Sequence, residues 1–575
     1  MKKTSPLYAR YSEDGSRHQL LKEHSENVAR LAAASCDAIG LKSLGALVGL
    51  LHDCQKAAQE WQAYLKTKVQ GHAVDQVPHA PQAARWIWQR YGQTAKGRAE
   101  KVAAQIAAMA VYSHHNTLFD VLAPDGKAEF RKRLDEKEDD AFASFFEDVV
   151  SLAELDELFC SATREVQAVI GALEPAAKKS APQGAAESAL RECRDFFAGL
   201  VARFVFSALI DADRYDAACF EAGVEPAGDD CSGEGWEGLV SSFEANLGLR
   251  VADAIQKADP KITAARQSIS DSCCNFAKHG AGVYRLYVPT GAGKSFAALR
   301  FALHHAAQHG KSRVIVVEPY LTIIDQIAEE YRGVLGEHAE TVLEYHSNMT
   351  LQEDDDSRIS RLLAERFDSK VVVTTLVQFL DTLFSGKGGS ARRLRSFANA
   401  VIILDEIQAI PAKCVDLFNL AARFLVDVCK ATVVLCTATQ PAFTCAKHPL
   451  RLDEPKDLVP DFEEYFPLFR RAEVIHQKDH TYTPEELAEF IRTLGEQEQS
   501  VLAVVNTKSA ALALFSRLAA EPGRFSSVFF LSTHMCPAHR LDTIGTIKEG
   551  LANGTRLIVV STSLIEFGVD LSFDC

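Results

Sequence analysis

Five short apolar runs, rich in β-branched residues, place the strongest constraint on the fold of this 575-residue chain. From about Ala264 they read VYRLYVP, RVIVVEP, KVVVTT, AVIILDE and TVVLCTAT, and segments with helical periodicity separate them. Because a strand that is buried on both faces reads as a continuous apolar run, this alternation predicts parallel strands in an α/β fold. A similar alternation resumes after about Leu458 with SVLAVVNT, SVFFLST and TRLIVVST, which predicts a second α/β region.

Residues 18 to 220 have a different pattern. Segments such as SENVARLAAASCDAI and AEKVAAQIAAMAVYSHH carry apolar residues at helical spacing, which predicts an all-helical region. A polar, acidic and Gly-rich stretch from Gly223 to Gly238 then reads as a linker, and we expect a bridging helix after it. The predicted organisation is therefore an all-α domain at 1–225, a linker and bridging helix at 226–263, and two α/β domains at 264–457 and 458–575.

Composition and charge exclude several classes of protein. No apolar run reaches the roughly 18 residues of a membrane-spanning helix, and the N-terminal segment lacks the apolar core of a signal peptide, so we expect a cytoplasmic protein without membrane contact. The formal net charge of -15 argues against a surface that binds nucleic acid everywhere. A basic run with Lys387, Arg392, Arg393 and Arg395 is a local exception, and it is interpreted either as a DNA contact or as a solvated loop.

A phosphate-binding loop is indicated at Leu286–Ser295, LYVPTGAGKS, where an apolar strand, a Gly-rich turn and a helix follow one another. In such a loop the backbone N–H groups face the phosphates, Lys294 reaches the outer phosphates and Ser295 binds Mg²⁺. Val288 stands where the general pattern has its first Gly. The expected nucleotide-binding residues here are Thr290, Gly291, Ala292, Gly293, Lys294 and Ser295.

A pair of acids follows a later strand in VIILDEIQ. Ligand sites in open α/β sheets lie at the carboxyl ends of the strands, where Asp405 and Glu406 stand. We expect Asp405 to hold Mg²⁺ through water and Glu406 to polarise the water that attacks ATP.

These segments together resemble the motifs of superfamily 2 helicases. The series comprises PTGAGKS, EPY with Gln326, TT with Gln378, DEIQ, CTATQP, VVNTK and STSLIEFGVD. The resemblance implies two RecA-like lobes with ATP between them, with Thr437 and Thr439 coupling hydrolysis to strand movement, and with Arg266 helping to hold the nucleotide. The chain ends at Cys575, before the Arg-rich motif of the family, so we expect the second lobe to be incomplete. The sequence is then either a fragment or a protein that binds ATP without efficient turnover.

The helical region also contains a series of His and Asp residues. They are His24, His52 with Asp53, His79, His114 with His115, and Asp213. Such ligands suit first-row divalent metals, and an aspartate can bridge two ions. Two ions held in this way activate water at neutral pH and stabilise the leaving oxygen of a phosphodiester.

This order of residues resembles the HD phosphohydrolase superfamily, and its fusion to a helicase resembles the CRISPR-associated helicase-nucleases of type I interference systems. The resemblance implies that His24, His52, Asp53 and Asp213 hold one metal, and that Asp53, His79, His114 and His115 surround a second. Asp211 competes with Asp213, and Asp213 is favoured because it stands in the A-D pair that the family uses. The implied ions are one or two of Mn²⁺, Co²⁺, Ni²⁺ or Fe²⁺ at this site, and ATP with Mg²⁺ at the helicase site.

The implied activity is ATP-dependent translocation joined to metal-dependent cleavage of single-stranded DNA. The implied catalytic residues are His52, Asp53, Lys56 and Glu406, with Lys56 acting through its charge on the scissile phosphate or on a carboxylate. The implied partner is an RNA-guided type I CRISPR surveillance complex with its target DNA. Two alternatives stay open: an ATP-binding recruitment fragment without motor activity, and a repair or RNA helicase fused to an HD nucleotide phosphohydrolase.

Overall fold

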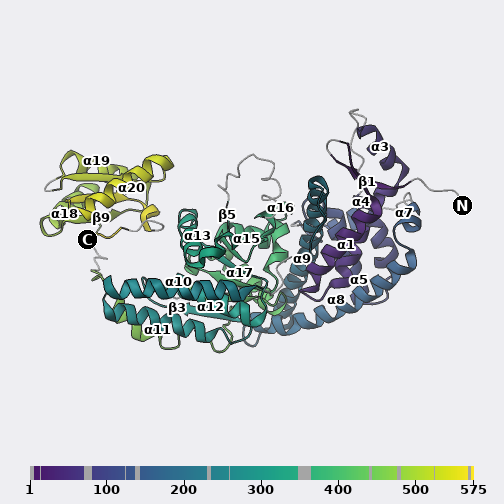
Figure 1. Cartoon of the computed structure of the whole chain (residues 1–575), viewed down its shortest axis with the longest axis horizontal. Helices are drawn as coiled ribbons and strands as arrows, with labels where there is room; N and C mark the ends of the chain where they lie inside the picture. Colours follow the sequence, from purple (N-terminus) through teal and green to yellow (C-terminus); the bar gives the residue numbers. More distant parts are fainter. Residues whose placement is uncertain are drawn as a thin grey trace. The chain divides into compact units, whose positions relative to one another are not determined.

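The chain divides into two compact units, which Figure 1 draws in one view. The first unit is Met1–Pro319 with Ile327–Phe469, and the second is Arg470–Cys575 with Tyr320–Gln326. The computed structural model describes residues 6–12, 15–69, 80–123, 125–135, 143–228, 235–257, 259–346, 364–439, 443–475, 481–522, 525–566 and 571–575. Within these ranges, every helix is too short or too polar to cross a membrane.

The N-terminal region is mostly helical, as the periodicity predicts. Its helices are α1 (Leu21–Asp37), α2 (Lys42–Leu51), η1 (Cys54–Ala57), α3 (Gln59–Val69), α4 (Ala80–Ile87), η2 (Trp88–Gly92), α5 (Arg98–Ser113), α6 (Glu129–Leu134), α7 (Ala143–Asp148), α8 (Leu152–Ser180) and α9 (Glu187–Ala222). A short antiparallel ribbon of β1 (Tyr8–Tyr11) and β2 (His18–Leu20) precedes them, and the prediction of an all-helical region omits it. Helices α10 (Trp236–Lys257) and α11 (Pro260–Phe276) follow the predicted linker.

Two glycines let α1 and α2 approach closely. A Cβ atom added at Gly49 would lie 2.5 Å from Cα of Ala29, and one added at Gly45 would lie 2.6 Å from the carbonyl oxygen of Ala32. Real Cβ atoms do not approach backbone atoms so closely, because protein interiors are close-packed. The spacing of α1 and α2, which carry His24 and lead into His52, therefore depends on glycine at these positions.

The first unit also contains a six-stranded parallel sheet. Its strands are β3 (Val283–Tyr287), β4 (Arg313–Glu318), β5 (Val342–Tyr345), β6 (Val371–Thr375), β7 (Ala400–Leu404) and β8 (Thr432–Thr437), in the order β3-β8-β7-β4-β6-β5. The five apolar runs of the sequence are β3, β4, β6, β7 and β8, and this part of the prediction is confirmed. The short β5, VLEY, is an edge strand that the apolar pattern does not reveal.

The direction of the chain through the sheet places helices on both faces. The step from β3 to β4 runs one way along the sheet, whereas the steps from β6 to β7 and from β7 to β8 run back. Because such crossovers are right-handed, α12 covers one face, and α15 and α17 cover the other. The helices after β3 are α12 (Lys294–His309), α13 (Leu321–Leu335), η3 (Gly336–Thr341), α15 (Leu376–Phe384), α16 (Gly388–Ala391), η4 (Arg392–Phe397), η5 (Ile407–Ala409), η6 (Ala412–Cys414), α17 (Val415–Asp427), η7 (Phe443–Cys445) and η8 (Phe462–Phe469).

One continuous apolar core joins the helical region to this sheet. Helix α9 packs against η4, and α17 packs against α8 and α9. Charged groups are enclosed at the same contact, in a cluster that we call the arginine seam. Here Asp211 of α9 lies between three buried arginines, Arg366, Arg392 and Arg395. Its carboxylate oxygens lie 2.7 Å from Nε of Arg392, 3.2 Å from Nε of Arg366 and 2.5 Å from Nε of Arg395.

The three arginines of the basic run are therefore neither a DNA contact nor part of a solvated loop. Arg392, Arg393 and Arg395 are at most 5% exposed, and Arg393 donates hydrogen bonds to Tyr345 and Gln378. A run of basic residues in the sequence does not show whether their side chains are buried. Here the carboxylate that compensates Arg392 and Arg395 is that of Asp211, on a helix far away in the sequence. Lys387 is exposed.

The second unit contains a three-stranded parallel sheet in the order β10-β11-β9. The strands are β9 (Ser500–Val504), β10 (Ser527–Leu531) and β11 (Leu557–Ser561), and the helices are α18 (Pro484–Gln497), α19 (Lys508–Ala520), α20 (Pro537–Ala552) and η9 (Ser563–Glu566). Residues 458–469 belong to the first unit, where the Phe462 ring lies 4.8 Å from the Tyr287 ring.

Candidate metal centre and nucleotide site

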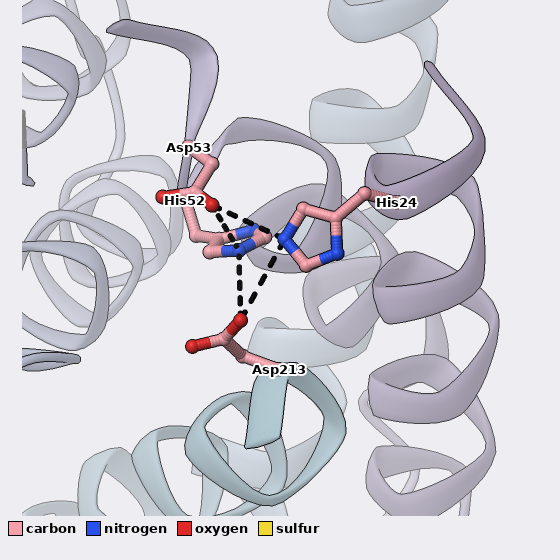
Figure 2. Close-up of side chains that lie close together, drawn as sticks. All are labelled: His24, His52, Asp53 and Asp213. Carbon is pink, nitrogen blue, oxygen red and sulfur yellow. Dashed lines mark hydrogen bonds and ion pairs between the residues drawn. The ribbon is translucent and has the colours of Figure 1, made fainter. Parts of the chain in front are cut away.

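Four of the residues predicted to hold a metal lie together in the helical region. Their potential ligand atoms are all within 4.8 Å of one another, and Figure 2 shows the side chains pointing at a common centre. The group consists of His24 on α1, His52 at the end of α2, Asp53 beside it and Asp213 on α9.

The two carboxylates face the two imidazoles from different sides. Nε2 of His24 lies 3.1 Å from Asp53 Oδ2 and 3.6 Å from Asp213 Oδ1. Nε2 of His52 lies 3.3 Å from Asp53 Oδ2 and 3.8 Å from Asp213 Oδ1. All four side chains are buried except that of Asp213, which is 15% exposed and marks the open side of the cluster.

A second group shares Asp53 and adds the paired histidines that follow α5. Asp53, His114 and His115 place potential ligand atoms within 4.8 Å of one another. Nε2 of His114 lies 3.6 Å from the Asp53 oxygen that is not nearest to His24, so the two oxygens of Asp53 face different groups of histidines. His79, the remaining predicted ligand, lies outside the described residues.

Backbone carbonyls fix the ring orientation of two histidines. Nδ1 of His52 lies 2.8 Å from the carbonyl oxygen of Gly49, and Nδ1 of His114 lies 2.6 Å from that of Val111. A carbonyl oxygen only accepts, so Nδ1 donates in both rings and the neutral ring has its lone pair at Nε2. Nε2 of His52 is buried and has no hydrogen-bond partner among the described residues. The donor set therefore fits a divalent ion with imidazole and carboxylate ligands.

The charges of the cluster are strongly interdependent. Burial alone would lower the pKa of His52, but the negative charge of Asp53 and the contact with Asp213 raise it to about 10. Burial would raise the pKa of Asp53, yet His52 and Lys56 hold it well below its usual range. Lys56, predicted as a catalytic residue, lies with Nζ 2.5 Å from Asp53 Oδ2. A cluster with this balance keeps both aspartates ionised.

The structure separates the two aspartates that compete in the sequence. Asp213 faces the histidines, whereas Asp211 points into the arginine seam. The two residues are two positions apart on α9, and a helix turns by about 200° over that interval, so they lie on opposite sides.

Sequence reasoning missed several residues around the cluster. Nη2 of Arg10, on β1, lies 3.0 Å from Nε2 of His24 and 3.4 Å from Oδ1 of Asp213. Asp216 contacts the far nitrogen of His24. The spacing of Asp213 and Asp216, three residues apart on one helix, is a signal that could have drawn attention to Asp216.

A cavity of about 710 Å³ lies at the predicted phosphate loop. The residues of this loop that line it are Thr290, Gly291, Gly293, Lys294 and Ser295, together with Arg266 and Glu406. Gly291 and Gly293 have φ values of 82° and 80°, which favour glycine, and Gly293 precedes the first residue of α12. The loop therefore presents the helix N-terminus to the cavity, an arrangement that suits an anion. Ala292 is buried, and Nε of Arg266 donates to the carbonyl oxygen of Gly291.

The predicted lysine and acids meet at this cavity. Nζ of Lys294 lies 2.7 Å from Oδ1 of Asp405 and also contacts Glu406. Burial would lower the pKa of Lys294, but these two carboxylates raise it, so the lysine stays charged. Thr437 donates to Gln408 at 2.8 Å, which joins the CTAT segment to the DEIQ segment.

Comparisons with known proteins show which families this chain resembles. Residues 267–447 match the DEAD/DEAH box helicase family. The chain is 25% identical over 306 residues to a CRISPR-associated nuclease/helicase Cas3 from Methanothermobacter thermautotrophicus, covering 50% of this chain and 35% of the relative. It is 29% identical over 179 residues to a Cas3 from Haloferax volcanii, covering 27% of this chain and 19% of the relative. The matched segments thus span about a third or less of these relatives.

The fold is similar to that of a solved Cas3. The crystal structure of T. fusca Cas3 with AMPPNP has a TM-score of 0.60 and 16% identity, with 99% of this chain and 71% of that chain covered. A chain in a CRISPR RNA-guided surveillance complex before nicking has a TM-score of 0.53 and 16% identity, with 99% and 68% covered. The resemblance of this chain to the CRISPR-associated helicase-nucleases is therefore confirmed, with Cas3 nuclease/helicases as its relatives in sequence and fold.

Proposed function

We propose that this chain joins an ATP-dependent DNA helicase to a metal-dependent nuclease that cuts single-stranded DNA. The observation that carries the proposal is the convergence of His24, His52, Asp53 and Asp213 on one centre. The similarity to proteins named CRISPR-associated nuclease/helicase supports the pairing of the two activities. By the same similarity, we propose that an RNA-guided surveillance complex with its target DNA recruits the chain.

The proposed metal site consists of two overlapping groups. His24, His52, Asp53 and Asp213 would hold one divalent ion, and Asp53, His114 and His115 would surround a second, with His79 as a further proposed ligand. When bound, such ions supply positive charge that activates water and stabilises the leaving oxygen of a phosphodiester. Lys56 helps to keep Asp53 ionised and would add positive charge beside the scissile phosphate.

The proposed nucleotide site binds ATP with Mg²⁺ at the phosphate loop. The backbone N–H groups of Gly291 and Gly293 and the N-terminus of α12 bind phosphate oxygens. Lys294 would reach the outer phosphates, Ser295 would bind Mg²⁺ directly and Asp405 through water, and Glu406 would polarise the attacking water. Arg266 supports the loop through the Gly291 carbonyl.

A pair of variants tests whether the two sites are separate. With Mn²⁺ present, we expect the protein to nick circular single-stranded DNA, and we expect Asp53→Ala to abolish nicking and leave binding of a fluorescent ATP analogue unchanged. Lys294→Ala should do the reverse, with loss of ATP binding and intact nicking. Nicking by Asp53→Ala would refute the metal site. Hydrolysis of free nucleotides without cleavage of DNA would favour a nucleotide phosphohydrolase instead.

A further inference from the structure

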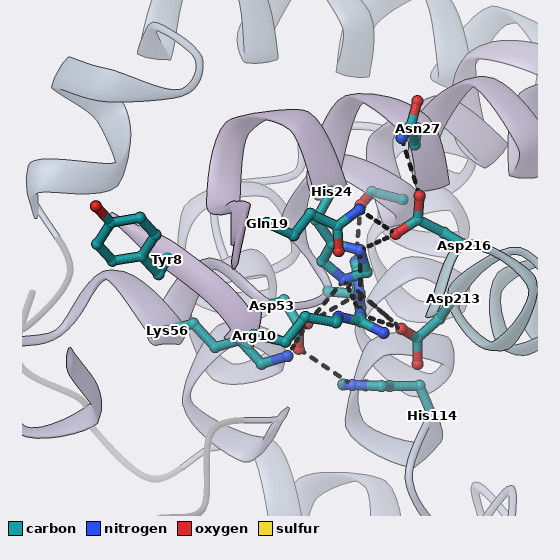
Figure 3. A network of polar contacts seen from close by, with 12 residues as sticks. Tyr8, Arg10, Gln19, His24, Asn27, Asp53, Lys56, His114, Asp213 and Asp216 are labelled. Carbon is teal, nitrogen blue, oxygen red and sulfur yellow. Dashed lines mark hydrogen bonds and ion pairs between the residues drawn. The ribbon is translucent and has the colours of Figure 1, made fainter. Parts of the chain in front are cut away.

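The carboxylate of Asp216 lies behind His24, on the side away from the centre of the cluster. Its Oδ2 atom lies 2.6 Å from Nδ1 of His24, and its side chain is only 1% exposed. Figure 3 shows Asp216 with two amide side chains around it. Gln19 donates from Nε2 to Oδ2 at 2.9 Å, and Asn27 donates from Nδ2 to Oδ1 at 2.9 Å.

These contacts make Nδ1 of His24 a hydrogen-bond donor. Both amides direct their N–H groups at Asp216, so the carboxylate acts as an acceptor towards all three neighbours. Nδ1 of His24 therefore donates to Asp216 at 2.6 Å, and a divalent ion bound between Asp53 and Asp213 would replace the longer 3.1 Å contact of Nε2 with Asp53. Asp216 thus holds the ring in the form and direction that a metal ligand requires.

The support of His24 differs from that of the other two buried histidines of the cluster, His52 and His114. His52 and His114 donate to neutral backbone carbonyls, whereas His24 donates to an ionised carboxylate. A carboxylate partner makes the imidazole a stronger donor to a cation, because its negative charge is transmitted through the hydrogen bond. The first group of ligands thus receives an additional negative charge just outside it.

Helix α9 supplies both the ligand and the support. Asp213 and Asp216 are three residues apart, so they lie on neighbouring positions of one helix side. Asp213 faces Nε2 of His24 at 3.6 Å, and Asp216 faces Nδ1 of the same ring. One helix therefore places a carboxylate on each side of the imidazole from α1, and only the one at Nδ1 is within hydrogen-bond distance.

We propose that Asp216 is a positioning residue that orients His24 and strengthens its binding to a divalent cation. This inference rests on the proposed metal site. The change Asp216→Asn keeps the size of the side chain but removes its charge. We expect the affinity for Mn²⁺, measured by isothermal titration calorimetry on the full chain, to fall by about 10- to 100-fold. Nicking of single-stranded DNA should fall at limiting Mn²⁺ and recover at saturating Mn²⁺, whereas binding of the ATP analogue should not change.

Asp195→Asn is the matched control, because Asp195 lies on the same helix with a 64% exposed side chain and, among the described residues, pairs with Arg191. It should bind Mn²⁺ like the unmodified chain. If Asp216→Asn does not fold, Asn27→Ala replaces it. That change removes one donor to the carboxylate and should weaken Mn²⁺ binding several-fold.

The outcomes separate this inference from the proposed function. Equal Mn²⁺ affinity in the unmodified chain and in Asp216→Asn, or in Asn27→Ala if that variant is needed, overturns the role of Asp216 and leaves the metal site standing. Failure of the unmodified chain to bind Mn²⁺ overturns both. Weaker binding in Asp216→Asn with normal binding in Asp195→Asn supports the inference.

Discussion

Two aspartates on one helix should respond to the same substitution in opposite ways. Asp211→Asn removes a carboxylate that contacts the Nε atoms of all three buried arginines, at distances of 2.5 to 3.2 Å. Removing one partner of a buried ion pair leaves the remaining charge uncompensated and costs about 3–5 kcal/mol. We therefore expect Asp211→Asn to lower the free energy of unfolding of the first unit by about that amount.

Asp213→Asn should cost much less, on the order of 1 kcal/mol, because the side chain is 15% exposed and shares its cluster with the like charge of Asp53. This variant should instead lose at least tenfold in Mn²⁺ affinity, since it removes a proposed ligand.

Urea unfolding followed by tryptophan fluorescence measures the difference in the free energy of unfolding between Asp211→Asn and Asp213→Asn. The four tryptophans of the chain, Trp61, Trp86, Trp88 and Trp236, all belong to the first unit, so the signal reports that unit alone. Similar losses of stability in the two variants would refute the assignment of Asp211 to the seam and Asp213 to the cluster. So would an Asp211→Asn variant as stable as the unmodified chain.

Three further predictions follow from buried groups. His305 is fully buried between the carbonyl of Ala277 and the hydroxyl of Thr432, and burial lowers its pKa to about 3. Above pH 6.5 the ring is neutral in the folded and in the unfolded chain. As the pH falls towards 3, only the unfolded chain takes up the proton, so the free energy of unfolding falls by up to about 5 kcal/mol. In urea titrations between pH 4 and 6.5, the free energy of unfolding of His305→Gln should fall less steeply with decreasing pH than that of the unmodified chain. An equal slope in the two proteins would contradict this. Gly49→Val should destabilise the first unit by about 1–3 kcal/mol in the same assay, because its side chain meets the backbone of α1; unchanged stability would contradict the close packing. Arg393→Met should leave the salt dependence of single-stranded DNA binding unchanged because the guanidinium is buried, and a reduced slope would show that it contacts phosphate.

The sequence predicts the strands of the first sheet well because their apolar runs are continuous. It does not predict their order, since β3 pairs with β8 across some 150 residues and no local pattern encodes that pairing. The residues of the candidate site are predictable as a set because His and Asp suit divalent ions and because their order resembles the HD phosphohydrolase superfamily.

The orientation of each side chain is harder to predict. Asp211, Asp213 and Asp216 occur within six residues of one helix and have three different surroundings. Their directions depend on the rotation of α9 about its axis, which packing on α1 and η4 determines. The burial of Arg392 and Arg395 is hidden from sequence reasoning for the same reason, since their partner stands on α9.

The shared core of the first unit limits how this molecule can be taken apart. A fragment that stops near residue 225 would keep every described residue of the histidine–aspartate cluster, but it would expose the apolar side of α8 and α9 to water and leave Asp211 without its counterions. Dissection of the two proposed activities therefore needs point substitutions rather than deletion. Transplanting the helical region into another protein would require a new surface to replace η4 and α17.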